Sequence, residues 1–558
     1  SLWEEELVRM QGLLTDEVIE NAFQTAWPQA VYDIDGPRIV ETLKERRDNL
    51  RNFATAFYKK KAQAVDVIGT EEQDYFLVER FSNGDVKVRV WGAKKDGTLK
   101  NQYYERTFKK GETKEVRLYG LGKKDRFEFK GEATDGPIIR AIGGLGEDQF
   151  QDKVQRGGVR KNLIYDAKSL DIDYERGKSS KLLLKEDPKY NTYNRKSLDY
   201  QFDFVGIVPS LTFNPDDGFL VGGTANIRKY GFQKAPFSSA HKIDLRYAVA
   251  TGGWLLNYQG EWIDRIKKWD LLFQTHFQTP FYTGNFYGFG NDTRNFEETF
   301  EDEDEGNDFH RLRLREVDIY FGFMRKNQTR YFSIGPVFQS IRAELSDNRF
   351  ITTVAQDIDP ETFDGLEYAG AKAVYSYANT DQGGFPAYGI KAYAEAAYLQ
   401  QLDNSEISYP YIKGAFTLYR HLDANKQLVF ATRVGGQYTF NNEFTIFQGA
   451  VLGGIGRESN FRGFRRDRYR GKASFYQNID LRWKLNSNNN ALLPFSSGLI
   501  AGFDHGRVWL DGEDSDTWHY SFGGGIFLNP FDQIAISFTA FHTDNNITRF
   551  VFSGGFFF

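Results

Sequence analysis

The chain has 558 residues, with 71 lysines and arginines, 76 aspartates and glutamates, and a net charge of −5. This balance excludes a global basic field for nucleic acid, and the absence of cysteine excludes disulfides and thiolate metal sites. Aromatic residues reach 16%, with 54 glycines and 14 prolines, which is typical of many strands and tight turns. No run of about 18 apolar residues predicts a membrane-spanning helix.

Residues 1–70 are predicted to be helical. Thr15 precedes an acidic first turn and apolar residues at helical spacing, as an N-cap does. A second helix is predicted to start at Gly36 and Pro37, since proline favours the first turn of a helix. The chain opens on Ser1 rather than Met, so we expect a mature or truncated N-terminus. The segment is interpreted as a helical cap without chemistry of its own.

A small β domain is predicted over residues 71–160. The period of polarity becomes two, and Asp125 and Phe127 of one segment recur as Asp148 and Phe150 of a second. The stretch GGLGED, which ends at Asp148, resembles one unit of a calcium-binding β-roll, so Asp148 is a weak calcium candidate. One complete unit cannot enclose calcium between successive turns, and a short β-stack with glycine turns is the favoured interpretation.

Residues 161–200 are rich in Lys and Asp without clear periodicity and are predicted to be a linker. From 201 to 558, segments of roughly 9 to 14 residues alternate in polarity, which is typical of a transmembrane barrel wall. In one of them Ile534 and Phe538 share an apolar face while Ser537 lies on the other. A soluble sandwich shows similar alternation but with shorter strands. Eleven strands before position 440 and five after position 472 make sixteen antiparallel strands.

Two charged stretches interrupt this pattern. The arginine-rich ESNFRGFRRDRYRGK, residues 458–472, suits a nucleic-acid patch, a solvated loop, or an insert whose charges find partners inside another structure. The acidic segment 297–308 is expected to be a solvated loop, with weak support for calcium. The last predicted strand, near 546–558, ends in FVFSGGFFF, with four aromatic residues on one face: Phe550, Phe552, Phe556 and Phe558.

The stretch VLGGIGRESNFRGF resembles the sixth-loop motif of the BamA/TamA superfamily of outer-membrane proteins, the bacterial surface antigen family. Phe461, Arg462, Gly463 and Phe464 match the core of that motif. FYGFGNDT, YQNIDLRWKL and GFDHGRVW resemble three further motifs of the family. Asp480 stands where the family usually has Glu, and Phe and Asp are adjacent in the last motif. The resemblance covers the predicted barrel.

The resemblance implies that a sixth extracellular loop folds back into the wide lumen of the barrel. Arg462 would then meet Asp480 and Asp504, on the two strands after the loop, in charge-assisted pairs that are partly shielded from water. Gly463 would let the backbone approach the wall. The other arginines of the loop would line the lumen or its mouth.

Both strands at the predicted closing seam pair poorly. The first contains Gly206 and Pro209, and proline cannot donate to a strand ladder. The last contains Gly554 and Gly555, followed by Phe558, whose ring resembles the C-terminal signal that outer-membrane barrels present to their assembly machinery. In the family this seam is thought to open toward lipid, and we expect the same here.

The resemblance implies protein translocation, insertion or surface display across the bacterial outer membrane, with a periplasmic N-terminal region. The expected partners are outer-membrane lipid, lipopolysaccharide and a protein client or complex subunits, without nucleic acid. No cofactor, catalytic residue or resident metal is expected, because the seven histidines show no ligand spacing.

Two alternatives stay open. The first is a structural or accessory barrel that anchors a periplasmic or surface domain or complex. The second is the membrane anchor of a metallophosphoesterase whose catalytic domain lies upstream. VDVIGT and RTFKKGETKEVRLYGLG resemble a region that follows such a domain in large Bacteroidota surface-antigen-type proteins. The β-α-α-β-β order of the family's usual POTRA modules is not recognisable.

Overall fold

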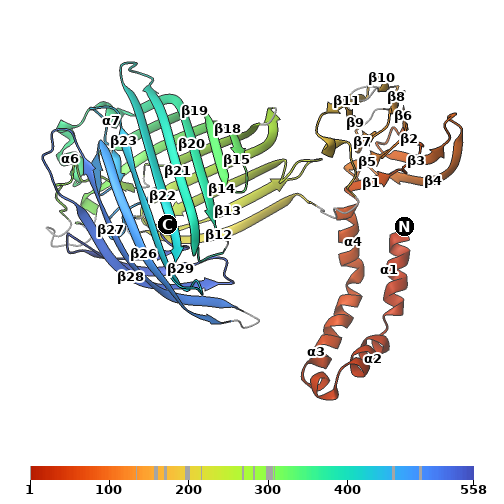
Figure 1. Cartoon of the computed structure of the whole chain (residues 1–558), viewed down its shortest axis with the longest axis horizontal. Coiled ribbons are helices and arrows are strands. Elements are labelled where there is room, and N and C mark those ends of the chain that lie inside the picture. The colour runs from red at the N-terminus through yellow and green to blue at the C-terminus, as the bar shows by residue number, and fades with distance from the viewer. Residues whose placement is uncertain are drawn as a thin grey trace. The chain divides into compact units, whose positions relative to one another are not determined.

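The chain divides into two units, Ser1–Tyr200 and Gln201–Phe558, which are described separately (Figure 1). None of the helices in the described part of the chain is long and apolar enough to cross a membrane. The computed structural model describes residues 2–132, 135–155, 161–168, 172–194, 201–214, 217–266, 269–280, 283–296, 306, 308–381, 383–454, 459–488 and 493–558.

The first unit begins with four helices, in which α1 lies against α4 and α2 against α3. The hydroxyl of Thr15 accepts a backbone amide of the first turn at 3.2 Å, so this residue caps α2 as predicted. The predicted helix start at Gly36 and Pro37 is wrong, because α3 begins at Gln29, directly after Pro28, and continues through both residues. An interior proline removes one intrahelical hydrogen bond without ending this helix. The helices are α1 (Leu2–Leu13), α2 (Asp16–Ala26), α3 (Gln29–Asp48) and α4 (Leu50–Lys61).

The rest of the first unit is a short parallel β-solenoid with two antiparallel strands at the edge of one sheet. The chain passes between two sheets, so each coil adds a parallel strand to both. Phe76, Phe127 and Phe150 stack in register, with 4.6 and 5.0 Å between ring centroids, inside the hydrophobic core. One sheet runs in the order β1 (Ala64–Ile68), β5 (Glu115–Tyr119), β7 (Ile138–Ile142), β9 (Asn162–Ala167) and β11 (Ser180–Lys185). The other runs β10 (Asp173–Glu175), β8 (Gln149–Asp152), β6 (Arg126–Gly131), β2 (Asp74–Arg80), β3 (Val86–Ala93) and β4 (Leu99–Phe108).

The prediction of a linker over 161–200 is wrong. Strands β9, β10 and β11 lie in this range and complete both sheets of the solenoid, and the short helix η1 (Pro188–Tyr190) follows them. Strands this short show too few alternations to be recognised among charged residues. The predicted helical segment 1–70 is also too long, since α4 ends at Lys61 and β1 begins at Ala64.

Buried aspartates repeat along the solenoid. Asp125 accepts the backbone amide of Asp74 at 2.7 Å, and Asp148 accepts that of Asp125 at 2.8 Å. Burial raises the pKa of Asp125 to about 9, of Asp148 to about 7 and of Asp166 to about 6. Asp148, the weak calcium candidate, therefore holds a backbone amide of the preceding coil. The described residues contain no group of three or more side chains placed to bind a metal.

The solenoid is expected to lose stability as the pH rises. The folded pKa values of Asp125, Asp148 and Asp166 lie above the value of about 3.9 for an unfolded aspartate. The stabilising contribution of the neutral carboxyls is complete below about pH 4 and is lost as the pH rises through the folded pKa values. Asp125→Asn keeps the acceptor and removes the buried charge, so it should stabilise the fold by about 1–3 kcal/mol near pH 9.

Amide hydrogen exchange of strands β6 and β8 in the full chain, corrected for the intrinsic exchange rate, measures this pH dependence. Asp125→Asn should flatten the decline. The matched control is Asp96→Asn, which replaces an exposed carboxylate in a turn and should leave the decline unchanged. A decline equally steep in the Asp125 variant and in the wild type would contradict the explanation.

The second unit is one antiparallel sheet that curls into a barrel (Figure 1). β16 and the three-residue β17 both pair with β18, so the seventeen strands among the described residues form a wall of sixteen positions, which confirms the predicted number. The strands before the long loop are β12 (Phe204–Asn214), β13 (Gly218–Lys229), β14 (Ser239–Ala248), β15 (Trp254–Ile266), β16 (Trp269–Gln278), β17 (Thr283–Asn285), β18 (Arg311–Lys326), β19 (Arg330–Glu344), β20 (Leu366–Thr380), β21 (Tyr388–Gln401), β22 (Ser408–His421) and β23 (Leu428–Thr439). Those after it are β26 (Ala473–Asn488), β27 (Phe495–Trp509), β28 (His519–Pro530), β29 (Ile536–Thr543) and β30 (Thr548–Ser553). Short helical turns α6 (Phe350–Thr353), η3 (Ala355–Asp357) and α7 (Glu361–Asp364) connect β19 to β20.

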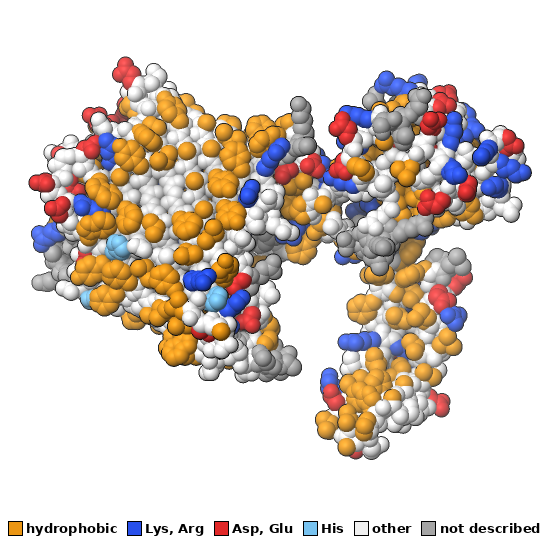
Figure 2. Space-filling view, viewed as in Figure 1, with side chains coloured by type: hydrophobic (Ala, Val, Ile, Leu, Met, Phe, Trp, Pro, Cys, Tyr) orange, Lys and Arg blue, Asp and Glu red, His pale blue; other side chains and the backbone are white. Residues whose placement is uncertain are grey.

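The outer surface of the barrel is apolar. On β29 the ring of Phe538 is 48% exposed, whereas Ser537 and Thr539 are buried on the inner side. Figure 2 shows apolar side chains over most of the visible wall. Such a surface suits contact with lipid. Of the predicted acidic loop 297–308, the acidic residues before Asp308 lie outside the described residues, and Asp308 pairs with arginines of the barrel.

Candidate functional site

The long loop between β23 and β26, residues 440–472, folds into the barrel and is called loop six below. The buried rings of Phe461 and Phe464 stack at 4.5 Å between centroids. Gly463 has a φ of +83°, and a Cβ added there would lie 2.9 Å from the Cγ2 of Thr543 on β29. Glycine is needed because the loop presses against the inner wall at this point. Within the loop, β24 (Ala450–Leu452) pairs with β25 (Tyr469–Gly471).

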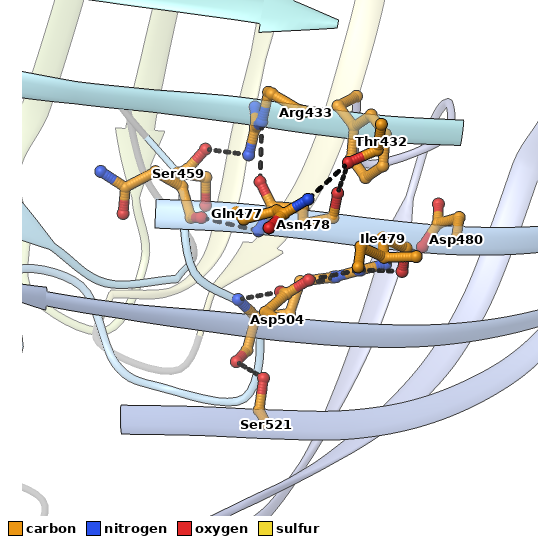
Figure 3. Close-up of polar contacts among 12 residues, drawn as sticks. Thr432, Arg433, Ser459, Gln477, Asn478, Ile479, Asp480, Asp504 and Ser521 are labelled. Carbon is orange, nitrogen blue, oxygen red and sulfur yellow. Dashed lines mark hydrogen bonds and ion pairs between the residues drawn. The ribbon is translucent and has the colours of Figure 1, made fainter. Parts of the chain in front are cut away.

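Arg462 joins loop six to three successive strands. Its Nη1 lies 2.6 Å from Asp480 on β26, and its Nε and Nη2 donate to both carboxylate oxygens of Asp504 on β27, at 2.9 and 2.5 Å. Its backbone amide also donates to Asp504 at 3.0 Å, and its carbonyl accepts the hydroxyl of Ser521 on β28 at 2.7 Å. Figure 3 shows Asp480, Asp504 and Ser521 on their three strands. These are the two carboxylates that the sequence named as partners of Arg462.

The contact between Arg462 and its carboxylates is shielded from water. Arg462 is 4% exposed, Asp480 1% and Asp504 0%. A buried pair of this kind adds little net stability compared with apolar packing, but removing one partner leaves an uncompensated charge and is strongly destabilising. The geometry therefore makes the position of loop six sensitive to any movement of β26 or β27.

Three further wall residues, Arg433, Asn478 and Arg482, complete the site, and the sequence did not lead us to predict them. Arg482 is fully buried and pairs with the second oxygen of Asp480 at 2.8 Å. Asn478 accepts from Arg433 at 2.8 Å and donates to the carbonyl of Asn460 in loop six at 2.9 Å (Figure 3). Asn478, Asp480 and Arg482 occupy every second position of β26, within YQNIDLRWKL. The period of two along a strand was therefore the signal that places these three residues on one inner face.

A second set of contacts holds the segment of loop six that contains Arg468. Arg468 donates to the hydroxyl and to the carbonyl of Thr293, at 2.7 Å in each case. Asn291 forms two hydrogen bonds with the backbone of Val508 on β27, at 2.7 and 3.0 Å. The motif FYGFGNDT therefore links the loop to the wall, a role that its sequence alone did not indicate. The other arginines of the loop expected to line the lumen include three that are no more than 7% exposed: Arg465, Arg468 and Arg470.

The last predicted strand is wrong at its end. β30 stops at Ser553, and the chain turns at Gly554 and Gly555, where Gly555 has a φ of +145°. Phe550 and Phe552 remain on the outer wall, 65% and 74% exposed. The following residues, Phe556, Phe557 and Phe558, turn to the inside of the barrel instead of sharing that face.

Inside the barrel, these three phenylalanines meet the arginine cluster. The guanidinium carbon of Arg482 lies 4.2 Å from the ring centre of Phe556, and its Nη2 donates to the carbonyl of Phe558 at 3.0 Å. Arg462 lies 5.1 Å from the ring of Phe557. Guanidinium groups are attracted to aromatic faces most strongly where water is excluded, so the arginines offer these rings partners that a continued strand would not. We call residues 554–558 the inner tail.

The first and last strands of the barrel are not joined by a ladder. Among the described residues, β12 pairs with β13 and β30 with β29, and no pairing links β12 to β30. Gly206 and Pro209 lie on β12, opposite Asn226 and Gly223 of β13. Gly554, Gly555 and Phe558, the other seam residues named from the sequence, lie beyond the end of β30.

Comparison with known proteins places this barrel in a family context. A family model described as haemolysin secretion/activation protein ShlB/FhaC/HecB matches residues 311–528, which include Arg462 and both of its carboxylate partners. This match supports the resemblance to BamA/TamA-type outer-membrane proteins that the sequence motifs indicate. Proteins of this type are outer-membrane proteins with a periplasmic N-terminal region.

Solved structures of similar shape include BamA from Haemophilus ducreyi lacking POTRA domains 1–3. It is 14% identical, with a TM-score of 0.44 over 63% of this chain and 70% of that one. CdiB from Escherichia coli is 11% identical, with a TM-score of 0.38 over 62% of this chain and 59% of that one. CdiB from Acinetobacter baumannii is 12% identical, with a TM-score of 0.37 over 63% and 58%. Comparison with curated protein sequences finds no match.

Proposed function

We propose that this BamA/TamA-type barrel moves a protein client across or into the outer membrane, and that loop six holds the barrel closed between transport events. The observation that carries the proposal is the bridge from Arg462 to Asp480 and Asp504, which fixes a long loop inside the lumen. The description of the matched family as secretion/activation proteins supports a protein as the transported molecule.

The loop contacts the part of the wall that leads to the seam between β12 and β30. Arg462 reaches β26, β27 and β28, and Gly463 lies against β29. The inner tail, which follows β30, returns to Arg482 and Arg462. Movement of the last strands away from β12 would therefore disturb the same cluster that holds loop six. This arrangement supports a coupling between lateral opening of the seam and release of the loop.

The space beside loop six suits a hydrated polypeptide. A cavity of about 650 Å³ lies between the loop and the opposite wall, and it is lined by amide, hydroxyl and charged side chains of both signs. Asp244, Gln274 and Gln339 are among its lining residues, and Asp467 lines it from loop six. Such a lining favours polar backbone over lipid tails. Loop six lines one side of this cavity and occupies part of the lumen, so its movement would widen the path for a client chain.

The proposal predicts that locking the seam stops transport. The chain has no cysteine of its own, so cysteines introduced at Val208 on β12 and Val551 on β30 can be joined by cleavable bismaleimide linkers of graded length. The shortest linker that reacts should lower delivery of client proteins by at least about tenfold. Delivery is measured as the surface and secreted protein profile of cells that contain only the locked barrel, and cleavage of the linker should restore it.

The matched control joins Val208 to Thr224, which already lie opposite each other on β12 and β13. This link adds no new constraint and should leave the profile unchanged. A normal profile with a fully locked seam would contradict lateral opening. A profile that is also unchanged when the whole chain is removed would favour the accessory barrel, whose loop and inner tail simply fill the lumen.

A further inference from the structure

One region of the outer wall is covered by unusually small side chains. On β21, β22 and β23, Ala394 lies opposite Gly414, which in turn lies opposite Gly436. In the next row, Ala373 of β20 lies opposite Ala396 of β21. A barrel wall that faces lipid normally presents large apolar side chains at such positions. Several neighbouring small residues therefore leave a recess in the surface.

This recess is a groove of about 790 Å³. Its lining extends from β19 to β27, across seven neighbouring strands, which at about 4.8 Å per strand is about 29 Å. Figure 2 shows a pale area over β21 and β22, framed by apolar side chains. The large apolar and aromatic residues of the lining are Phe332, Tyr375, Ile412, Tyr438, Phe475 and Trp509.

The width of the groove limits what it can hold. On β22 the floor is Gly414, and the outward residues two positions away on either side are Ile412 and Phe416. These two residues stand about 13 Å apart along the strand. A hydrocarbon chain fits in this space, whereas a helix about 10 Å wide would leave little room for the side chains of Ile412 and Phe416. An empty groove would leave its lining without dispersion contacts, so hydrocarbon is expected to fill it.

The groove reaches the end of the barrel from which loop six arises. Ala473 is the first residue of β26 and Trp509 the last residue of β27, the two strands that follow the loop. In a BamA/TamA-type barrel this end faces the cell surface. The polar tips of Tyr438 and Trp509 suit the boundary between acyl chains and headgroups. We propose that the groove holds an acyl chain of lipid A, the lipid of the outer leaflet, which enters from this end.

Filling the groove tests the proposal. Ala394→Leu/Ala396→Leu adds two branched side chains to its floor, and Ala394→Val alone fills it less. Full-length barrel purified in mild detergent is incubated with lipid A or with phosphatidylethanolamine, and the retained lipid is counted by native mass spectrometry. The wild type should retain about fivefold more lipid A than phosphatidylethanolamine, and the double variant should lose about fivefold of its lipid A, with an intermediate loss for Ala394→Val.

The control variant is Ala369→Leu/Ala371→Leu, which changes two outward alanines with the same spacing on β20 outside the lining. It should keep the retention of the wild type. Equal retention of both lipids, or equal loss in both double variants, would overturn the proposal. A dimer of barrels that only the groove-filling variants dissociate would also overturn it, because a second copy would then be the occupant.

Discussion

Replacing Arg462 with alanine is expected to release loop six, raise the ion conductance of the barrel and abolish client transport. The change leaves the buried Asp504 without the two side-chain bonds that compensate its charge. Breaking a buried pair in this way costs about 3–5 kcal/mol. An alternative position of the loop that was populated only rarely then becomes favoured, since about 5.5 kcal/mol moves a two-state equilibrium from 1:99 to 99:1. Conductance across planar bilayers and the profile of delivered proteins in cells measure the two effects.

The matched control for Arg462 removes a different cation from the same loop. Lys472 pairs at 2.6 Å with Asp511, whose side chain is 61% exposed, so Lys472→Ala should cost no more than about 1 kcal/mol and leave conductance unchanged. Arg462→Ala/Asp504→Asn should recover stability without recovering the anchoring of the loop. Wild-type conductance and transport in Arg462→Ala would mean that the cluster only fills the lumen, as the accessory-barrel alternative requires.

The partners of Arg462 could be read from the sequence because they depend on strand periodicity. Asp480 and Asp504 lie opposite Gly502 and Asn478 in the ladder of β26 and β27, so they occupy neighbouring positions on the same inner face. A period of two places every second residue of such strands inside the barrel. The number of strands follows from the same regularity, and it was predicted correctly.

The features that the sequence did not reveal depend on contacts between distant residues. In a continuous strand with a period of two, Phe550 and Phe556 would face the same side. In the structure Phe550 faces outward, whereas Phe556 lies inside the barrel against Arg482, more than seventy positions earlier in the chain. The solenoid strands β9 and β11 likewise become strands because parallel neighbours pair with them, while their own sequence shows little alternation. Contacts with residues that are distant in the sequence determine the structure of both segments, and the local sequence pattern does not identify those residues.

Removing the aromatic rings of the inner tail is expected to weaken the barrel where its last strand meets loop six. The variant Phe556→Ser/Phe557→Ser/Phe558→Ser takes away ring faces that lie 4.2 Å from Arg482 and 4.8 Å from Arg433. Each partly desolvated cation–π contact contributes about 0.5–2 kcal/mol, and buried aromatic packing adds to this. The free energy of unfolding should fall by about 2–4 kcal/mol, and conductance should rise as the tail leaves the lumen.

The rings have two candidate roles. They act as an assembly signal before the barrel folds, or they act as a wedge, that is, they pack against the arginines inside the folded barrel and stabilise it. Refolding purified chains directly into liposomes bypasses the assembly machinery, so unfolding and conductance measured there report the wedge alone. Phe556→Leu/Phe557→Leu/Phe558→Leu keeps apolar volume and removes the ring faces, and it should fall between the wild type and the serine variant. Full stability and a closed barrel in the refolded serine variant would contradict the wedge. The tail would then matter only for assembly, and the seam would open without any link to Arg462.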